Sequence, residues 1–378
     1  MTVEYCRGCG CVMQSADPKR PGYIPEMVRG KNQVCQRCYQ IKHYGIVGNI
    51  QPNLEQIKNN IQKAIELSQL LVIAADYSDL TGTLPAWSGW ISDKPYLIVI
   101  NKVDLIPNRT KPVELIEYLK RYLEGKFHKM PQAIVLASGL KGNGVAILLE
   151  EIKKAVPSGA RIGLLGMTNV GKSSLIKQML LAEKSSLAPT VSKYPGTTLG
   201  LSNWSILKGR NTLIDTPGMA PGDRMGDLLC PECASQLAPN VKLGHKLWGI
   251  KPGKGMIIGN YFGIAQLGES EAVLITFNAP ELQIHRTDSS KIGGLLTNSP
   301  SWLGAICKKC SPQLKWKEGI ISLNPNTDVA IAGLGWISLR GTATEFKIWY
   351  PEGVRLEIRP ALVGKQDNDQ KLPTLAVT

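Results

Sequence analysis

The stretch Gly166-Met-Thr-Asn-Val-Gly171-Lys172-Ser173 decides the fold, because it matches the pattern GxxxxGKS in full. It follows the apolar run Ile162–Leu165 and precedes a helical stretch that begins near Ser174. In this strand–loop–helix context the pattern forms a loop that binds phosphate groups. Its glycines let backbone N–H groups curl round a phosphate, and the helix N-terminus favours the negative charge. A Gly-rich turn without a ligand is the alternative, and the context argues against it.

The phosphate loop predicts specific roles for its residues. The ammonium group of Lys172 should contact the β- and γ-phosphates of a nucleotide, and the hydroxyl group of Ser173 should bind Mg²⁺. The predicted nucleotide-binding residues of the loop are Gly166, Asn169, Val170, Gly171, Lys172, Ser173 and Ser174.

A second motif, Asn101-Lys102-Val103-Asp104, ends the apolar run Leu97–Ile100 and indicates which base is bound. The Asp104 carboxylate can accept both the N1–H and the exocyclic amine of guanine, whereas adenine presents no such pair of donors. Asn101 can tie neighbouring loops together, and the aliphatic stem of Lys102 can cover the face of the base.

Two further motifs also follow predicted strands. Ser138-Gly139-Leu-Lys comes after Ala133–Leu136, and a backbone N–H there could reach the guanine O6. Gly139 stands where this motif usually has Ala, which should cost little but loosen the loop. In Asp215-Thr-Pro-Gly218, Asp215 can hold Mg²⁺ through water and the Gly218 N–H can sense the γ-phosphate. One such motif alone fits a solvated turn, but all four together indicate a GTP site.

The order of these motifs is unusual. A typical GTPase presents the phosphate loop, a Thr switch, DxxG, NKxD and then SAK, whereas here NKVD and SGLK precede the phosphate loop. This order is a circular permutation, which a sheet tolerates because domain termini usually lie close together. Between residues 49 and 222, apolar runs alternate with helical stretches such as Leu54–Ile65 and Pro112–Gly125. We therefore predict an α/β fold with a mostly parallel sheet.

The length of 378 residues predicts two or three domains. We expect a zinc-binding module over 1–48, the permuted GTPase domain over 49–222 and a β-rich domain over 223–378. Four runs predict strands in the last part: Ala272–Phe277, Leu282–His285, Val329–Leu339 and Phe346–Tyr350.

The composition favours a partner that carries phosphate groups. The chain has 44 Lys+Arg against 30 Asp+Glu, a net charge of +14, and the excess is spread over all three parts. A nucleotide, RNA, DNA or a lipid head group fits this charge. The 43% hydrophobic and 20% charged content excludes a disordered chain. The N-terminus lacks signal-peptide features and the apolar runs are too short to cross a bilayer, so we expect a cytoplasmic protein without a membrane partner.

Eight of the nine cysteines form four CxxC pairs. In a reducing compartment such pairs suggest a metal before a disulfide. The first two pairs predict a closed, tetrahedral Zn²⁺ site, with ligands Cys6, Cys9, Cys35 and Cys38. Basic residues surround it, so it could dock on RNA or protein, or it could only support the GTPase domain. The other two pairs could form a second Zn²⁺ site or two unrelated turns, and their residues are Cys230, Cys233, Cys307 and Cys310. Cys11 is left over as a free thiol.

The chain resembles the YqeH family of circularly permuted, ribosome-assembly GTPases over essentially its whole length. The resemblance rests on the motif order, the N-terminal CxxC…CxxC pattern and the segment Cys35-Gln-Arg-Cys38-Tyr-Gln-Ile-Lys-His43-Tyr44-Gly45. It implies hydrolysis of GTP to GDP and phosphate, and a role in maturing the small ribosomal subunit through ribosomal RNA or pre-ribosomal particles. The second set of CxxC pairs departs from the family pattern.

The resemblance also carries over single residues. The implied catalytic residues are Lys172, Thr198, Asn169 and Gly218. Thr198 is assigned to Mg²⁺ together with Ser173 and Asp215, and Thr197 is the alternative. Asn169 matches the asparagine that binds K⁺ in potassium-activated relatives, and capping of the loop is its alternative role.

Met219 stands directly after DTPG, where some GTPases have a water-orienting Gln. Its thioether cannot polarise water, so we expect slow intrinsic hydrolysis that depends on K⁺ and a partner. A zinc-dependent RNA- or protein-binding factor with structural GTP and negligible turnover is the alternative, and a GTPase acting on tRNA or metal insertion is a third. Residues 234–268, which lack acidic side chains, could move with the nucleotide state or form a solvated linker.

Overall fold

The structure is a computed structural model. It describes residues 4, 6, 11–18, 20, 22–28, 30, 34–36, 38–39, 54–91, 93–107, 110–184, 200–304 and 306–364. The predicted ligands Cys9, Thr197 and Thr198 lie outside the described residues.

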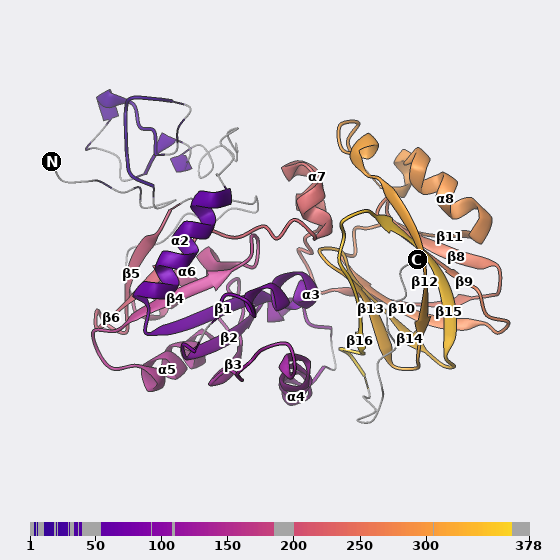
Figure 1. The fold of residues 1–378 in the computed structure, drawn as a ribbon, viewed down its shortest axis with the longest axis horizontal. Coiled ribbons are helices and arrows are strands. Elements are labelled where there is room, and N and C mark those ends of the chain that lie inside the picture. The colour runs from indigo at the N-terminus through magenta and orange to yellow at the C-terminus, as the bar shows by residue number, and fades with distance from the viewer. Residues whose placement is uncertain are drawn as a thin grey trace. The chain divides into compact units, whose positions relative to one another are not determined.

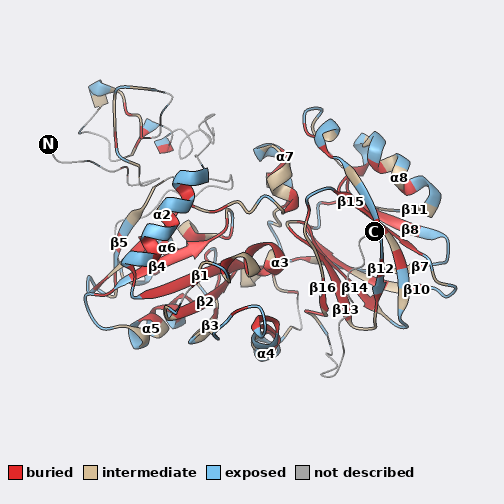
Figure 2. Ribbon diagram, in the orientation of Figure 1, coloured by how far each residue is buried: buried red, intermediate tan, exposed pale blue. Residues whose placement is uncertain are grey.

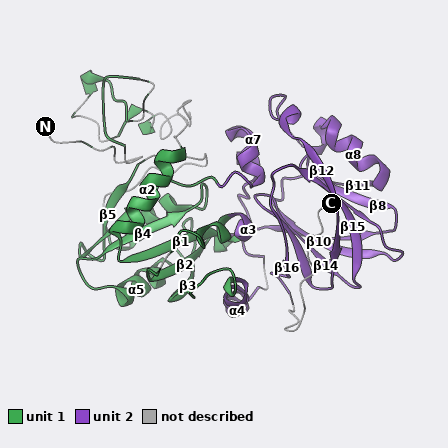
Figure 3. Cartoon of the chain, viewed as in Figure 1, with its two compact units in different colours: residues 1–77, 83–104, 123–220 green, residues 78–82, 105–122, 221–378 purple. Residues whose placement is uncertain are grey.

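The chain divides into two compact units (Figure 3). Unit 1 comprises residues 1–77, 83–104 and 123–220, and unit 2 comprises residues 78–82, 105–122 and 221–378. Two short pieces of the predicted GTPase domain therefore group with the C-terminal part of the chain. The division into three domains stays a prediction.

Unit 1 is built on a six-stranded sheet with the order β3-β2-β1-β4-β6-β5 (Figure 1). All neighbouring strands are parallel except β5, which is antiparallel to β6. The strands are β1 (Leu70–Asp76), β2 (Tyr96–Asn101), β3 (Ala133–Leu136), β4 (Arg161–Gly166), β5 (Ser202–Ile206) and β6 (Asn211–Asp215). The central strands β1 and β2 are buried along their whole length, as continuous apolar runs predict for parallel strands (Figure 2).

Helices cover this sheet because each has one apolar side. α2 (Leu54–Leu67) buries Ile57, Ile61 and Ile65 and packs against β4, while Leu54, predicted on the same face, is exposed. α5 (Val145–Ala155) and α6 (Lys172–Ala182) pack against each other. The short helices that begin in this unit are η1 (Glu26–Val28), η2 (Tyr77–Asp79), η3 (Pro85–Trp87) and η4 (Val103–Leu105).

Unit 2 contains two antiparallel five-stranded sheets, with orders β16-β13-β14-β10-β7 and β11-β8-β9-β15-β12. The strands are β7 (Gly244–Ile250), β8 (Lys254–Ile258), β9 (Phe262–Gln266), β10 (Ala272–Asn278), β11 (Ile284–Asp288), β12 (Trp316–Leu323), β13 (Thr327–Ile331), β14 (Gly335–Arg340), β15 (Thr344–Pro351) and β16 (Leu356–Pro360). Side chains from both sheets form one hydrophobic core, which includes Phe262, Leu274, Ile337 and Phe346.

Several helices accompany these sheets. They are α3 (Leu80–Thr83), α4 (Pro112–Leu123), η5 (Met225–Leu228), α7 (Pro231–Leu237), α8 (Ser289–Asn298), η6 (Ser301–Leu303) and η7 (Ser311–Gln313). None of the helices in the described part of the chain is both long and apolar enough to cross a membrane.

The predicted fold class is confirmed, with two corrections in detail. The run Val329–Leu339 is not one strand but the pair β13 and β14, because the turn between them places Gly333 at φ 77°. The alternative prediction that residues 234–268 form a solvated linker is wrong, because this stretch contains the end of α7 and the strands β7, β8 and β9. Its strands are short and interrupted by Gly and Lys, so the sequence does not show the alternation of apolar and polar residues that is typical of a strand.

Candidate guanine-nucleotide site

The four nucleotide motifs meet at the carboxyl edge of the sheet in unit 1. Adjacent strands place Ala74 beside Gly166, Ile100 beside Leu136 and Leu164 beside Asp215. Ligands of open α/β sheets bind at this edge. The strands can be renumbered 1 to 6 in the order β4, β5, β6, β1, β2, β3, so that the phosphate-loop strand comes first. Their order across the sheet, from β5 to β3, is then 2-3-1-4-5-6. The motifs then run in the order of a typical GTPase, so the permutation changes the connections and keeps the sheet.

Asn101 connects three of these loops. Its Nδ2 donates to the carbonyl oxygen of Val170 in the phosphate loop at 2.8 Å. Its Oδ1 accepts from the backbone N–H of Gly139 at 2.8 Å. The residue is 1% exposed, so solvent does not compete with these bonds. Asn101 therefore acts as the tie between loops that its motif predicts.

The Asp104 carboxylate is oriented by the hydroxyl group of Ser138, a predicted site residue whose side-chain role the motif did not indicate. The Ser138 hydroxyl donates to Asp104 Oδ1, and the same hydroxyl accepts from the N–H of Lys141 at 2.9 Å. The motif itself predicts only a backbone contact from the loop at 138–141. The hydroxyl side chain at its first position was the available signal, since Ser readily bonds neighbouring backbone groups.

Asp76, at the end of β1, is a residue that the sequence motifs did not identify. Its carboxylate forms an ion pair with the Lys102 ammonium, and the Asp76 side chain is 9% exposed. Lys102 itself adopts φ 63°. The pair fixes the direction of the Lys102 stem, which is the part predicted to cover the base. Asp76 could have been found because it ends a buried strand, as Asp215 does.

The phosphate loop has the backbone that its sequence demands. Asn169 at φ 65° and Gly171 at φ 87° occupy the left-handed region, which these residue types tolerate best. A Cβ on Gly171 would also lie 2.4 Å from Asn101 Nδ2. Lys172 is 7% exposed and its Nζ donates to the Gly166 carbonyl at 3.0 Å. The ammonium group is thus held at the loop that should receive the phosphates.

The DTPG loop is attached to the phosphate loop. The Thr168 N–H donates to the Met219 carbonyl at 2.9 Å, and a Cβ on Gly218 would come within 2.9 Å of Thr168 Cα. Only glycine permits this close approach. Met219 is 8% exposed, so it contributes a backbone bond while its thioether is buried.

The residues present fit Mg²⁺, which prefers oxygen ligands such as hydroxyls and carboxylates. Ser173 lies in the first turn of α6, and Asp215 ends β6, the strand next to β4. A bound Mg²⁺ would neutralise charge on the phosphates. Within this chain, Ser173 and Asp215 would hold the ion.

Three of the four N-terminal zinc candidates come together. The Sγ atoms of Cys6, Cys35 and Cys38 lie within 4.8 Å of one another, and all three residues are buried. The Cys35 N–H donates to Cys6 Sγ at 3.1 Å. Thiolate donors grouped in this way fit Zn²⁺. Cys11 packs beside the cluster and is not among these three ligands.

The four cysteines of the second set also meet, within unit 2. Their Sγ atoms all lie within 4.8 Å of one another. Burial raises the pKa of Cys233 to about 12 and that of Cys310 to about 11. A hydrogen bond from the Cys310 backbone lowers the pKa of Cys307 to about 7.

The comparisons with known proteins agree with this geometry. A family model described as "50S ribosome-binding GTPase" matches residues 161–243, and one described as "YqeH-like, C-terminal" matches residues 271–362. The uncharacterized protein YqeH of Bacillus subtilis (strain 168) is 25% identical over 371 residues, which cover 96% of this chain and 100% of that protein. The chain is a YqeH-like, circularly permuted GTPase.

Other proteins resemble a smaller share of this YqeH-like chain. NO-associated protein 1, chloroplastic/mitochondrial, of Arabidopsis thaliana is 26% identical over 399 residues, with 89% of this chain and 70% of that protein covered. The GDP-bound structure of TM YlqF shows 19% identity and a TM-score of 0.29, and covers 42% of this chain and 57% of its own.

In the YqeH-like chain, three loops at the carboxyl edge of the sheet continue directly into unit 2. The chain enters unit 2 at Ser78 after β1, at Leu105 after NKVD and at Pro221 after DTPG. Two nucleotide motifs, NKVD and DTPG, and the end of β1 are thus joined covalently to segments of unit 2.

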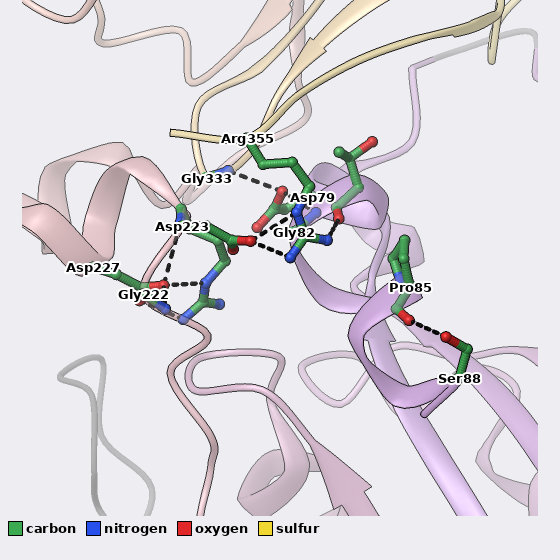
Figure 4. A network of polar contacts seen from close by, with 11 residues as sticks. Asp79, Gly82, Pro85, Ser88, Gly222, Asp223, Asp227, Gly333 and Arg355 are labelled. Atoms are coloured by element: carbon green, nitrogen blue, oxygen red, sulfur yellow. Dashed lines mark hydrogen bonds and ion pairs between the residues drawn. The ribbon is translucent and has the colours of Figure 1, made fainter. Parts of the chain in front are cut away.

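Polar contacts within unit 2 hold the first and third of these entering segments (Figure 4). Asp79 accepts from the N–H of Gly333 at 2.9 Å, and Arg355 donates to Asp223 at 2.8 Å. Both segments are thereby fastened to loops of the β sheets.

The segment that follows NKVD is held in unit 2 as well. On α4, the Tyr122 hydroxyl donates to Glu357 of β16 at 2.8 Å. Burial raises the pKa of Tyr122 far above its usual value, so the phenol stays a donor at every physiological pH. Each chain entry therefore has its own anchor on the β sheets.

Proposed function

We propose that this YqeH-like GTPase is a GTP-dependent switch in the assembly of the small ribosomal subunit. It acts in the cytoplasm and binds ribosomal RNA or pre-ribosomal particles. The observation that carries the proposal is the covalent continuity between the nucleotide loops and unit 2. A change at the γ-phosphate that moves the DTPG loop pulls on a segment fastened to the β sheets, so nucleotide state can alter what unit 2 presents to a partner.

A basic surface of unit 2 supports RNA as the partner. The acid-free stretch carries five exposed basic side chains, namely Lys242, His245, Lys246, Lys251 and Lys254. Lys254 is paired with Asp288. Arg286 of β11 lies over the ring of Trp248 of β7 at 5.8 Å, which adds a guanidinium and an aromatic ring at the edge strands of the two sheets. Cations bind backbone phosphates and flat side chains stack on bases.

We further propose that K⁺ stimulates hydrolysis through Asn169. Its side chain is exposed, and the backbone at φ 65° holds it at the tip of the phosphate loop. A cation bound by this amide oxygen would offset negative charge between the phosphates, where other GTPases use an arginine.

The proposed function is tested by GTP hydrolysis in K⁺ and in Na⁺, each with and without small ribosomal subunits. The proposal expects acceleration by K⁺ and by the subunits. Hydrolysis is also measured with large ribosomal subunits for comparison, because the description of the family model that matches residues 161–243 names the 50S ribosome. A second candidate is a zinc-dependent RNA- or protein-binding factor in which GTP is structural, favoured by the buried Met219. Rates near zero that neither addition changes would support it.

The role of Asn169 has its own variant. Asn169→Gly removes the amide and keeps the left-handed backbone accessible. We expect the K⁺-stimulated rate to fall at least about tenfold, towards the Na⁺ rate, with unchanged GTP affinity. If K⁺ stimulated the Asn169→Gly variant as strongly as the wild type, Asn169 would not bind K⁺ and its role would be to cap the loop.

A further inference from the structure

Four cysteines of unit 2 meet although two of them lie far from the others in the sequence. Cys230 Sγ is 3.8 Å from Cys307 Sγ, across 77 residues of chain. A disulfide requires about 2.0 Å between the sulfurs, so this pair is not one. Zn–S bonds of about 2.3 Å in a tetrahedron place the sulfurs about 3.8 Å apart. We propose that Cys230, Cys233, Cys307 and Cys310 bind one structural Zn²⁺, which clamps α7 to the loop between α8 and β12.

Backbone N–H groups surround the four sulfurs. The Cys230 N–H donates to Cys310 Sγ at 3.2 Å, and the Cys307 N–H donates to Cys233 Sγ at 3.4 Å. Such donors stabilise negative charge on thiolates and fix the direction of each ligand. Each bond also crosses between the two CxxC pairs, so the ligands of one pair are oriented by the backbone of the other.

The charge of the site is balanced in part by its own sequence. Four thiolates and one Zn²⁺ carry a net charge of about −2. Lys308 and Lys309 lie between the two ligands of the second pair and are exposed. Their ammonium groups offset this charge without entering the buried centre.

The donor set decides the kind of metal site. Four protein thiolates leave no position for water or substrate, so the site is structural and not catalytic. Sulfurs within 4.8 Å of one another leave room for a single ion. An iron–sulfur cluster would need thiolates spread over several irons.

The clamp joins two stretches with little regular structure of their own. Cys230 precedes α7 and Cys233 lies within it, while α7 contributes Leu237, 5% exposed, to the core of the β sheets. Cys307 and Cys310 lie in a loop whose described residues form only the short helices η6 and η7. The metal would close the long loop of chain between the two CxxC pairs. A cross-link that closes a long loop removes much entropy from the unfolded chain and so stabilises the folded one. α7 is also the first α-helix after the DTPG loop, so the metal anchors the segment that leaves the nucleotide site.

Metal content tests the proposal directly. The full wild-type chain should contain two zinc ions, one for each cysteine cluster. Cys307→Ser should contain one, as should Cys35→Ser, whereas the matched control Cys11→Ser should keep both. One zinc in the wild type, two in Cys307→Ser, or iron in place of the second zinc would overturn the proposal.

A second measurement uses the wild-type chain and so does not depend on how the variants fold. Zinc is removed with a chelator and amide hydrogen exchange is followed. The amides of Ala234 in α7 and Ser311 in the loop should exchange at least about tenfold faster, and together, because the metal holds both. The amide of Ile337 in β14 should keep its protection. Unchanged exchange at Ala234 and Ser311 after complete removal of zinc would overturn the clamp.

Discussion

At the scale of residues, nucleotide recognition depends on side chains that hold the loops as well as on those predicted to touch GTP. Asn101 bonds both the phosphate loop and the loop at Gly139, and the Ser138 hydroxyl orients Asp104. The base-recognition loop is therefore pre-organised, which lowers the entropy cost of binding.

Asp104 should determine the choice of base. In Asp104→Asn one carboxylate acceptor is replaced by an amide donor, which opposes the guanine exocyclic amine and suits the carbonyl of xanthine. We expect the affinity for GTP to fall about 10³-fold and XTP to bind more tightly than GTP. Titration with fluorescent GTP and XTP measures both. The exposed Asp93 provides the matched control Asp93→Asn, which should bind like the wild type. Retained preference for GTP in Asp104→Asn would contradict the assignment.

Gly139 has a tighter environment than the motif suggested. The sequence indicated a looser loop, but a Cβ here would lie 2.9 Å from Ser174 Cβ and 3.0 Å from the Leu175 backbone nitrogen. Gly139→Ala should therefore push α6 away and weaken GDP binding about tenfold, since overpacking costs about 1–3 kcal/mol. The dissociation rate of fluorescent GDP measures this. Gly89→Ala, with no atom within 4 Å of its added Cβ, is the control. Equal dissociation rates of GDP for the two variants would show that the loop at Gly139 accommodates the added methyl group without displacing α6.

At the scale of elements, the sheet of unit 1 was the most predictable part. The expected strand at 133–136 has the observed bounds, and the strand predicted at 162–165 is β4 over Arg161–Gly166. Parallel strands are buried on both faces, so they appear as short unbroken apolar runs. These runs also allowed the motifs to be placed at the ends of strands, because each motif follows the end of such a run.

Other elements could not be predicted for physical reasons. β7 has three exposed residues and a single buried one, and it pairs with β10, which lies beyond β8 and β9 in the chain. The CxxC spacing indicated that the second cysteines could bind metal. Spacing alone could not show that the two pairs meet across 77 residues, because that depends on how the β sheets fold.

Arg355 and Asp223 should couple the DTPG-proximal segment to the β sheets. Arg355 Nε donates to Asp223 Oδ2 at 2.8 Å, and the Arg355 N–H donates to the Asp223 carbonyl at 2.8 Å. The side chains are 28% and 32% exposed, so screening is partial. A double-mutant cycle with Ala at both positions should give a coupling of about 1 kcal/mol. Native-state exchange of the Met225 amide, which is bonded to Ala332, reports it.

The control for this cycle is the pair Lys111–Glu114, whose side chains are 77% and 59% exposed. Such an exposed pair should show coupling close to zero. If the cycle at Arg355 and Asp223 gave the same value as this control, the ion pair would not hold the segment.

At the scale of the whole molecule, the permutation has a functional consequence. In the permuted chain the DTPG loop is not followed by another strand of the sheet in unit 1, and the chain continues into unit 2 at Pro221. The segments that follow β1 and NKVD do the same. In the proposed function, a nucleotide-dependent change in these loops would reach unit 2 through the backbone itself, and the net charge of +14 would favour binding to RNA.

The most direct test is co-sedimentation of the full chain with purified small ribosomal subunits, in a non-hydrolysable GTP analogue and in GDP. The account predicts binding at least about tenfold tighter with the GTP analogue, since coupling energies of this kind are typically 1–3 kcal/mol. Asp104→Asn should bind the subunits only when an XTP analogue replaces the GTP analogue. Equal binding with GTP analogue and GDP, or binding to large subunits alone, would contradict it.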